Sequence, residues 1–169
     1  MYMRFFGLSL LLLSGTLWAA EPTGQPRLEK RGSAIQLMVD GKPFLILGAE
    51  VHNSSSSSLD YMAPIWPKLA ALPLNTVLTP LSWELVEPEE GKFDFALLDG
   101  LLTQAREHHL KIVFLWLAAW KNGMSSYAPL WVKRDPHRFP RAVRNGNEAE
   151  ILSTLSNAWS KPTAKPSRG

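Results

Sequence analysis

The stretch from Thr76 to Leu117, TVLTPLSWELVEPEEGKFDFALLDGLLTQAREHHLKIVFLWL, decides the fold class. It opens with a short apolar run over Thr76–Leu81, which predicts a buried strand. Residues Ala96–His109 then place their apolar side chains on one face at helical spacing, which predicts an amphipathic helix. The run Lys111–Leu117 is almost continuously apolar, as expected for a parallel strand covered on both faces. This alternation of strand and helix predicts an α/β fold with a parallel sheet.

A broken helix is predicted just upstream of this stretch. Residues Leu59–Leu72 carry apolar side chains at helical spacing, and Ser58 is placed to cap the first turn. Pro64 and Pro67 lie inside the segment, and proline interrupts the hydrogen bonding of a helix interior. We therefore expect the helix to start late or to break at the prolines.

Two hairpins flank the α/β pattern. Asp-Gly and Asn-Gly dipeptides between apolar runs predict tight two-residue turns. The turns are Asp40-Gly41, between Ile35–Val39 and Phe44–Leu47, and Asn145-Gly146, between Pro140–Arg144 and Glu150–Leu155.

The two ends of the chain differ in character from its body. Residues 1–20 combine Arg4 with an apolar run and small residues before Glu21, which predicts a secretory signal peptide and an exported protein, periplasmic or extracellular. The apolar run is shorter than the ~20 residues of a bilayer span, so no membrane span is expected after cleavage; a retained anchor is the alternative. Residues 21–34 are predicted to be a linker, 35–158 the folded part, and 159–169 a disordered tail.

The distribution of charge argues against a nucleic-acid-binding face on residues 21–132. The net charge of the chain is +3. Residues 21–132 nevertheless hold nine basic and twelve acidic side chains, whereas residues 133–169 hold eight basic and three acidic. The positive charge belongs to the C-terminal stretch, and a nucleic-acid binder is expected to show a basic face with interleaved aromatics.

Candidate ligand-binding residues follow three predicted strands. The carboxyl ends of parallel strands share one edge of a sheet, and barrel enzymes place their sites there. Carboxylates and amides hydrogen-bond sugar hydroxyls, and indole rings pack on the C–H face of a sugar. The candidates for binding an oligosaccharide or polysaccharide are Glu50, His52, Asn53, Trp83, Glu84 and Trp120.

The sequence contains no motif for a metal site, a cofactor site or a serine nucleophile. The chain has no cysteine, and His52 has no second ligand at metal-binding spacing, so no metal site is expected. The fingerprints of a phosphate loop, a dinucleotide site and a serine nucleophile elbow are absent from the sequence, so no cofactor is expected.

The segment Trp83–Phe95, WELVEPEEGKFDF, resembles a signature of the family 35 β-galactosidases. That signature is Trp-Asn-x-His-Glu-Pro, a short turn and Gly-x-Phe-Asp-Phe, preceded by Asn-Thr-Val as at residues 75–77 here. Residues 48–52 are similar to the family's Gly-Glu-x-His-Tyr segment, and residues 128–132 to its Pro-x-Trp-Leu. The sequence departs from the family where Asn53 replaces Tyr, Glu84 replaces Asn and Val86 replaces His, and where Ala119-Trp120-Lys121 replaces Cys-Ala-Glu. Because of these departures, the resemblance does not identify the sugar that the protein acts on.

The resemblance implies a (β/α)8 TIM barrel and retaining hydrolysis of O-glycosyl bonds by two glutamates, an acid/base after strand four and a nucleophile after strand seven. Such a pair lies ~5 Å apart. A barrel of this kind needs ~200–250 residues, so we expect this chain to be an incomplete, inactive N-terminal part whose catalytic glutamates lie beyond it. Asn147-Glu148 matches the acid/base dipeptide only by coincidence, because it lies in a predicted hairpin. The alternatives are a small exported carbohydrate-binding module without catalysis and a remnant without function.

Overall fold

The computed structural model describes residues 24–121 and 126–155. The chain divides between Leu45 and Ile46 into two compact units. The predicted signal peptide (residues 1–20) and tail (159–169) lie outside the described residues.

The first unit is a small antiparallel sheet. Its strands are β1 (Arg27–Arg31), β2 (Ala34–Val39) and β3 (Lys42–Pro43), paired in that order. Asp40 and Gly41 have φ of 52° and 74°, as a tight turn of two left-handed residues requires, so the first predicted turn is confirmed.

This unit corrects two predictions. The linker predicted over residues 21–34 is wrong from Arg27 onward, because the polar segment RLEKR pairs along its whole length with β2. The folded part predicted to begin at residue 35 is also misplaced, since residues 35–45 belong to this unit and not to the parallel sheet.

The second unit contains the parallel sheet that the sequence predicts. Its strands are β4 (Gly48–Glu50), β5 (Thr76–Ser82) and β6 (Lys111–Leu117), in the order β4-β5-β6. Both pairs are parallel, and β5 pairs with β6 from Thr76↔Lys111 to Ser82↔Leu117. The parallel strand β4 begins at Gly48, after the apolar run Phe44–Leu47 that the sequence analysis took for a strand.

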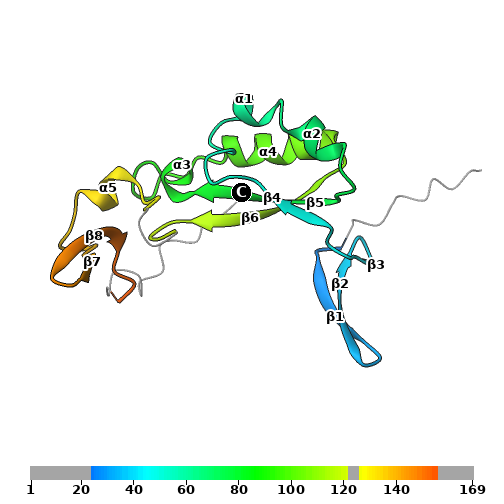
Figure 1. The fold of residues 1–169 in the computed structure, drawn as a ribbon, viewed down its shortest axis with the longest axis horizontal. Helices are drawn as coiled ribbons and strands as arrows, with labels where there is room; N and C mark the ends of the chain where they lie inside the picture. Colours follow the sequence, from blue (N-terminus) through cyan, green and yellow to red (C-terminus); the bar gives the residue numbers. More distant parts are fainter. Residues whose placement is uncertain (1–23, 122–125, 156–169) are drawn as a thin grey trace, which may run out of the picture. The chain divides into compact units, whose positions relative to one another are not determined.

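Three helices cover one face of this sheet (Figure 1). They are α1 (Leu59–Met62), α2 (Trp66–Ala70) and α4 (Ala96–Glu107). Residues from these helices and from β5 form a buried core, which includes Met62, Trp66, Val77, Leu101 and Ala105. The predicted helix at Leu59–Leu72 is broken as expected.

The start of α1 and the start of α4 are fixed by side-chain oxygens. Ser58 Oγ accepts a hydrogen bond from the Tyr61 amide at 3.2 Å, which confirms the predicted cap. Asp94 Oδ1 accepts from the Ala96 amide at 2.8 Å, just ahead of α4. Each bond satisfies an amide that has no partner within its helix.

A proline is accommodated in the central strand. Proline cannot donate to a ladder and is normally confined to sheet edges. In β5, Thr76 and every second residue after it, including Pro80, direct their backbone groups toward β4. The hydrogen bonds between β5 and β4 end at the bond from the Val51 amide to Leu78 O. The missing amide of Pro80 therefore faces the region beyond the end of β4. There the buried Ser56 hydroxyl donates to the Pro80 carbonyl, which the short β4 leaves unpaired.

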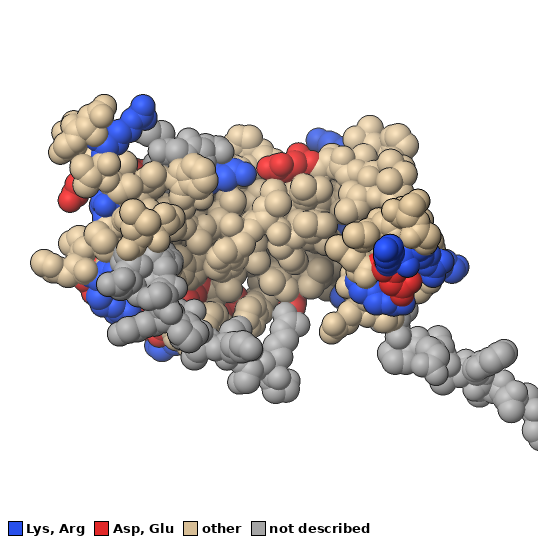
Figure 2. All heavy atoms as spheres, turned by 90° about the horizontal axis from the view of Figure 1, so that it is seen from below, with Lys and Arg blue, Asp and Glu red and all other residues tan. Residues whose placement is uncertain are grey.

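Among the described residues of this unit, no helix covers the opposite face of the sheet. Strand β6 is only partly buried along most of its length, and the side chain of Val113 is 40% exposed. Seen from the side away from the helices, the middle of the surface carries few charged side chains (Figure 2). The expectation that β6 is covered on both faces is therefore wrong for the described residues.

A second group of short elements follows the carboxyl ends of β5 and β6. It comprises α3 (Trp83–Val86), α5 (Leu130–Lys133), β7 (Arg141–Arg144) and β8 (Asn147–Leu152). Its core contains Trp83, Ala128, Val132, Phe139 and Leu152. Strands β7 and β8 form the second predicted hairpin, with Asn145 and Gly146 at φ of 52° and 79°, although its second arm begins at Asn147, earlier than predicted.

None of the helices in residues 24–121 and 126–155 combines the length and the apolar character of a membrane span.

Candidate functional site

The candidate residues meet at the edge of the sheet where β4, β5 and β6 end. Because all three strands run parallel, Glu50, Trp83 and Trp120 all lie at this carboxyl edge. Glu50 is the last residue of β4, Trp83 follows β5 directly, and Trp120 lies three residues after β6. The sequence-based grouping of these strand ends is consistent with the geometry.

An ion pair links the two outer strand ends. Lys121 Nζ lies 3.7 Å from Glu50 Oε1, although β5 separates β4 from β6. The side chain of Lys121 is mostly buried, whereas that of Glu50 is half exposed. The Glu50 carboxylate is therefore accessible from solvent and retains acceptor capacity, since a carboxylate has two oxygens with about four lone-pair sites.

A second ion pair fixes Glu84. Lys133 Nζ lies 3.1 Å from Glu84 Oε2, and the Glu84 amide donates to Tyr127 O at 3.0 Å. Lys133 is on α5, so this contact joins the end of β5 to a helix 49 residues further on. Sequence analysis missed both Lys121 and Lys133 as partners, because neither pairing follows from spacing along the chain.

Trp83 is part of a core. The residue is 7% exposed, and its Nε1–H donates to Glu87 Oε2 at 2.7 Å. Its ring meets that of Trp131 edge to face, with the ring centroids 5.6 Å apart. This packing gives Trp83 a structural role, in place of the sugar-stacking contact expected from the sequence.

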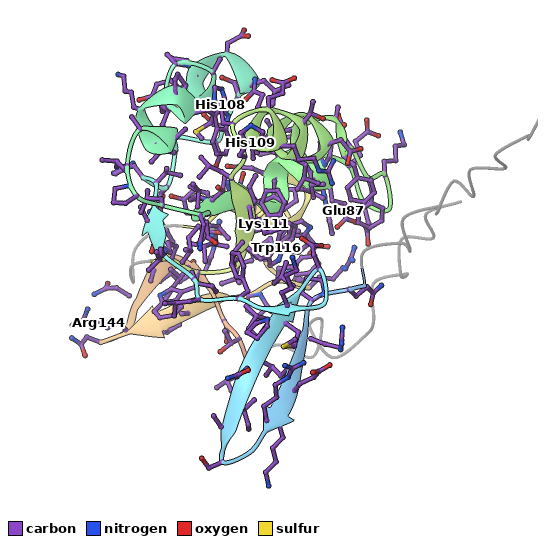
Figure 3. All side chains as sticks on the ribbon, turned by 90° about the vertical axis from the view of Figure 1, so that its right-hand side faces the viewer. Glu87, His108, His109, Lys111, Trp116 and Arg144 are labelled. Carbon is purple, nitrogen blue, oxygen red and sulfur yellow. The ribbon has the colours of Figure 1, made fainter. Side chains whose placement is uncertain are left out.

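Glu87 organises the loop that carries Glu84. The residue, labelled in Figure 3, is 4% exposed. Besides the bond from Trp83, its carboxylate accepts a bond from the Gly91 amide at 2.8 Å. Its carbonyl accepts from Trp131 Nε1 at 3.1 Å. Three donors thus converge on one buried residue and hold α3, the following turn and α5 together.

The remaining candidates differ in their exposure to solvent. Trp120 is 58% exposed and His52 is exposed, while Asn53 is partly buried. An exposed indole at the end of a strand offers a flat apolar face with one polar edge, which suits stacking on a sugar ring.

Outside this edge, Arg138 forms a third ion pair, with Glu90. Its guanidinium donates two bonds to the Glu90 carboxylate, at 2.7 and 3.1 Å, and lies 4.8 Å from the centroid of the Phe139 ring. The hydrogen bonds from Arg138 lower the pKa of Glu90, and the same contact raises that of Arg138.

The Asn147-Glu148 dipeptide lies outside the candidate site. Asn147 and Glu148 are both exposed and lie at the start of β8, in the hairpin. Within residues 24–121 and 126–155, no group of three or more His, Cys, Asp or Glu side chains is placed to hold a metal ion.

Solved structures similar to the described fold include two glycosidases. One is an exo-β-1,4-mannosidase, Op5Man5, from Opitutaceae bacterium strain TAV5, with 24% identity and a TM-score of 0.45; the match covers 57% of this chain and 20% of that one. The other is endo-glycoceramidase II from Rhodococcus sp. in its ganglioside GM3 complex, with 20% identity and a TM-score of 0.45, covering 65% of this chain and 29% of that one.

Two curated proteins match parts of the sequence. A β-galactosidase of Xanthomonas manihotis is 38% identical over 78 residues, which are 46% of this chain and 12% of that protein. The human β-galactosidase-1-like protein 3 is 41% identical over 58 residues, 34% of this chain and 9% of that protein. The matched segments thus span about a tenth of the length of these relatives.

The profile of a glycoside hydrolase family also matches the chain. It is the β-galactosidase profile of the glycoside hydrolase 42 type, and it matches residues 67–153, which run from α2 through the β7–β8 hairpin. The matched stretch is more than half of the 169 residues and contains the ends of β5 and β6, with Glu84, Trp120 and both lysines. The chain therefore belongs to this β-galactosidase family of glycoside hydrolases.

Proposed function

We propose that this chain is part of an exported glycoside hydrolase that acts on β-galactosides. The match of residues 67–153 to the β-galactosidase family carries the proposal. Within that family we assign it to a branch close to the family 35 enzymes, because Trp83–Phe95 retains most of their signature.

We further propose that β4, β5 and β6 are the first three strands of a (β/α)8 barrel. Three consecutive parallel strands with their helices on one face support this. In such a barrel the uncovered face of the sheet becomes the interior, and the carboxyl edge becomes the mouth that holds the active site.

At that mouth, the proposed sugar contacts are Glu50, His52, Asn53, Glu84 and Trp120. The two carboxylates are acceptors for sugar hydroxyls and Trp120 is a stacking surface. The lysines hold these carboxylates in place, Lys121 on Glu50 and Lys133 on Glu84. We assign the acid/base and the nucleophile of a retaining mechanism to no residue of this chain.

Substitution of Glu50 tests this assignment. Titration of the 169-residue chain with galactose should give a Kd that rises about tenfold or more in Glu50→Ala, because a charge-assisted hydrogen bond contributes ~1.5–3 kcal/mol. Glu89→Ala is the control, since Glu89 is exposed and pairs with Lys92 in a turn. Equal affinities of the two variants would remove Glu50 from the site.

A second candidate function is binding without catalysis. The accessible Glu50 carboxylate and the exposed Trp120 favour it, since both are suited to hold a sugar.

We expect the 169-residue chain to hydrolyse aryl β-galactosides at the background rate, because retaining hydrolysis needs two carboxyl groups ~5 Å apart. Turnover by a preparation free of host β-galactosidase would show that the chain holds a catalytic pair.

Export is tested separately. If residues 1–20 are a signal peptide, the N-terminus of the secreted protein begins near Glu21. N-terminal sequencing that finds Met1 on the secreted protein would contradict this.

A further inference from the structure

The carboxyl edge of the parallel sheet brings a hydrogen-bond donor and a hydrogen-bond acceptor together. Lys121 Nζ lies 3.7 Å from Glu50 Oε1, although β4 and β6 lie on opposite sides of β5. A carboxylate only accepts hydrogen bonds and an ammonium group only donates them. A sugar hydroxyl can do both, so the pair offers complementary partners to two hydroxyl groups at once.

The two lysines of this edge differ in how their ammonium groups are engaged. Lys133 Nζ lies 3.1 Å from Glu84 Oε2 and donates a hydrogen bond to it. The 3.7 Å separation of Lys121 from Glu50 is that of an ion pair and exceeds the length of a hydrogen bond. In the part of the chain that the structure describes, the Lys121 ammonium makes no hydrogen bond. Its donors are therefore available to a ligand.

The surroundings of Lys121 hold this donor ready for binding. Its side chain is only 26% exposed, whereas that of Glu50 is 50% exposed. A side chain that is already ordered loses little conformational freedom when it binds a ligand. The neighbouring Trp120 is 58% exposed and adds an apolar face on which a sugar ring can pack.

We propose that Lys121 contacts the sugar directly and, together with Glu50, recognises two hydroxyl groups on neighbouring ring carbons. The inference rests on the proposed sugar site and gives Lys121 a binding contact in addition to its ion pair with Glu50. Neighbouring hydroxyls fit the pair because a donor and an acceptor 3.7 Å apart bind oxygens that also lie close together. The site should therefore prefer galactosides in which both of these hydroxyls are unsubstituted.

Titration with deoxy sugars tests which hydroxyl each side chain contacts. The wild-type 169-residue chain, Glu50→Ala and Lys121→Met are titrated with galactose and with the derivatives of galactose that each lack one hydroxyl. We expect the Kd of galactose to rise about tenfold or more in Lys121→Met, because a charge-assisted hydrogen bond is lost. The derivative without the hydroxyl that Lys121 contacts should bind more weakly than galactose to the wild type, but as well as galactose to Lys121→Met.

The position of that hydroxyl separates a direct contact from a positioning role. If Lys121 binds the sugar, Lys121→Met and Glu50→Ala should become insensitive to the loss of two different hydroxyls, on neighbouring carbons. If Lys121 only holds Glu50, both variants become insensitive to the same hydroxyl, and the inference is overturned.

Lys92→Met is the matched control. Lys92 is 72% exposed and pairs with Glu89 in a turn, so this variant should bind galactose like the wild type. A wild-type chain that does not bind galactose would overturn the proposed sugar site together with this inference. Binding by the wild type that Lys121→Met leaves unchanged would overturn the inference alone.

The ammonium signals of the wild type give a readout that does not depend on the folding of a variant. In an NMR spectrum of the lysine Nζ groups, galactose should shift the signal of Lys121 and slow the exchange of its protons. The signal of Lys92 should stay unchanged. A Lys121 signal that saturating galactose does not alter would overturn the inference.

Discussion

At the scale of single residues, the carboxyl edge of the sheet is organised by carboxylates with different surroundings. Glu50 and Glu84 each face a lysine and remain partly accessible, whereas Glu87 is buried among hydrogen-bond donors. Glu50 and Glu84 are therefore suited to bind a ligand, whereas Glu87 has a structural role.

Glu87 should therefore matter for stability. Glu87→Ala leaves the Trp83 indole and the Gly91 amide without their acceptor, and an unsatisfied buried donor costs ~1–3 kcal/mol. We expect a loss of about 2–3 kcal/mol in the free energy of unfolding, measured by urea denaturation. Glu89→Ala should leave it nearly unchanged, and equal losses in the two variants would show that the observed network does not stabilise the fold.

The Glu90–Arg138 pair should respond to pH. Its hydrogen bonds lower the pKa of Glu90 below the ordinary value of 4.5, so the stability it contributes is present above that value and is lost as pH falls through the lowered pKa. In Arg138→Gln, a carbon-detected NMR titration should show the pKa of Glu90 return toward 4.5. Arg144→Gln removes an exposed arginine on β7 and is the control; an unchanged pKa of Glu90 in Arg138→Gln would contradict the assigned cause.

At the scale of elements, the turn that follows α4 contains a strained residue. His109 has φ of 58°, which costs a side-chain-bearing residue about 1 kcal/mol relative to glycine. The Leu110 amide donates to Ala105 O across this turn, a common way for a helix to end.

Glycine at position 109 should thus stabilise the chain. We expect His109→Gly to raise the free energy of unfolding by about 0.5–1 kcal/mol, observed as a higher Tm. His108→Gly is the matched control, because His108 has φ of −98° and glycine there only adds freedom to the unfolded chain. A lower Tm for His109→Gly would mean that its imidazole makes a stabilising contact.

The elements that sequence predicts well are those fixed by local rules. Apolar runs located β5 and β6, and helical periodicity located α4. The prolines marked the break between α1 and α2, and two dipeptides marked the turns at Asp40 and Asn145. The polar strand β1 was missed because nothing in its own composition marks it as a strand; it exists by pairing with β2.

The candidate site was predictable only in part. The carboxyl edge followed from the order of the strands, and Glu50 and Trp120 are accessible there. The burial of Trp83 depends on Trp131 and Glu87, and the lysine partners depend on contacts across as many as 71 residues, from Glu50 to Lys121. Such tertiary contacts leave no local pattern in a single sequence.

At the scale of the whole molecule, the family match, the parallel strands and the carboxyl-edge residues support one account. We propose that the chain contributes a sugar-binding edge to a glycoside hydrolase; its β1–β2–β3 sheet lies outside the segment that matches the family. We therefore expect sugar to contact the carboxyl edge of the parallel sheet and not the β1–β2–β3 sheet.

The most direct test is NMR mapping of galactose binding on the isotope-labelled 169-residue chain. The account predicts amide shifts at Glu50, Trp120 and Lys121 that saturate with galactose, are lost in Glu50→Ala and are absent from β1 and β2. Shifts confined to the β1–β2–β3 sheet, or a spectrum that galactose leaves unchanged, would contradict it.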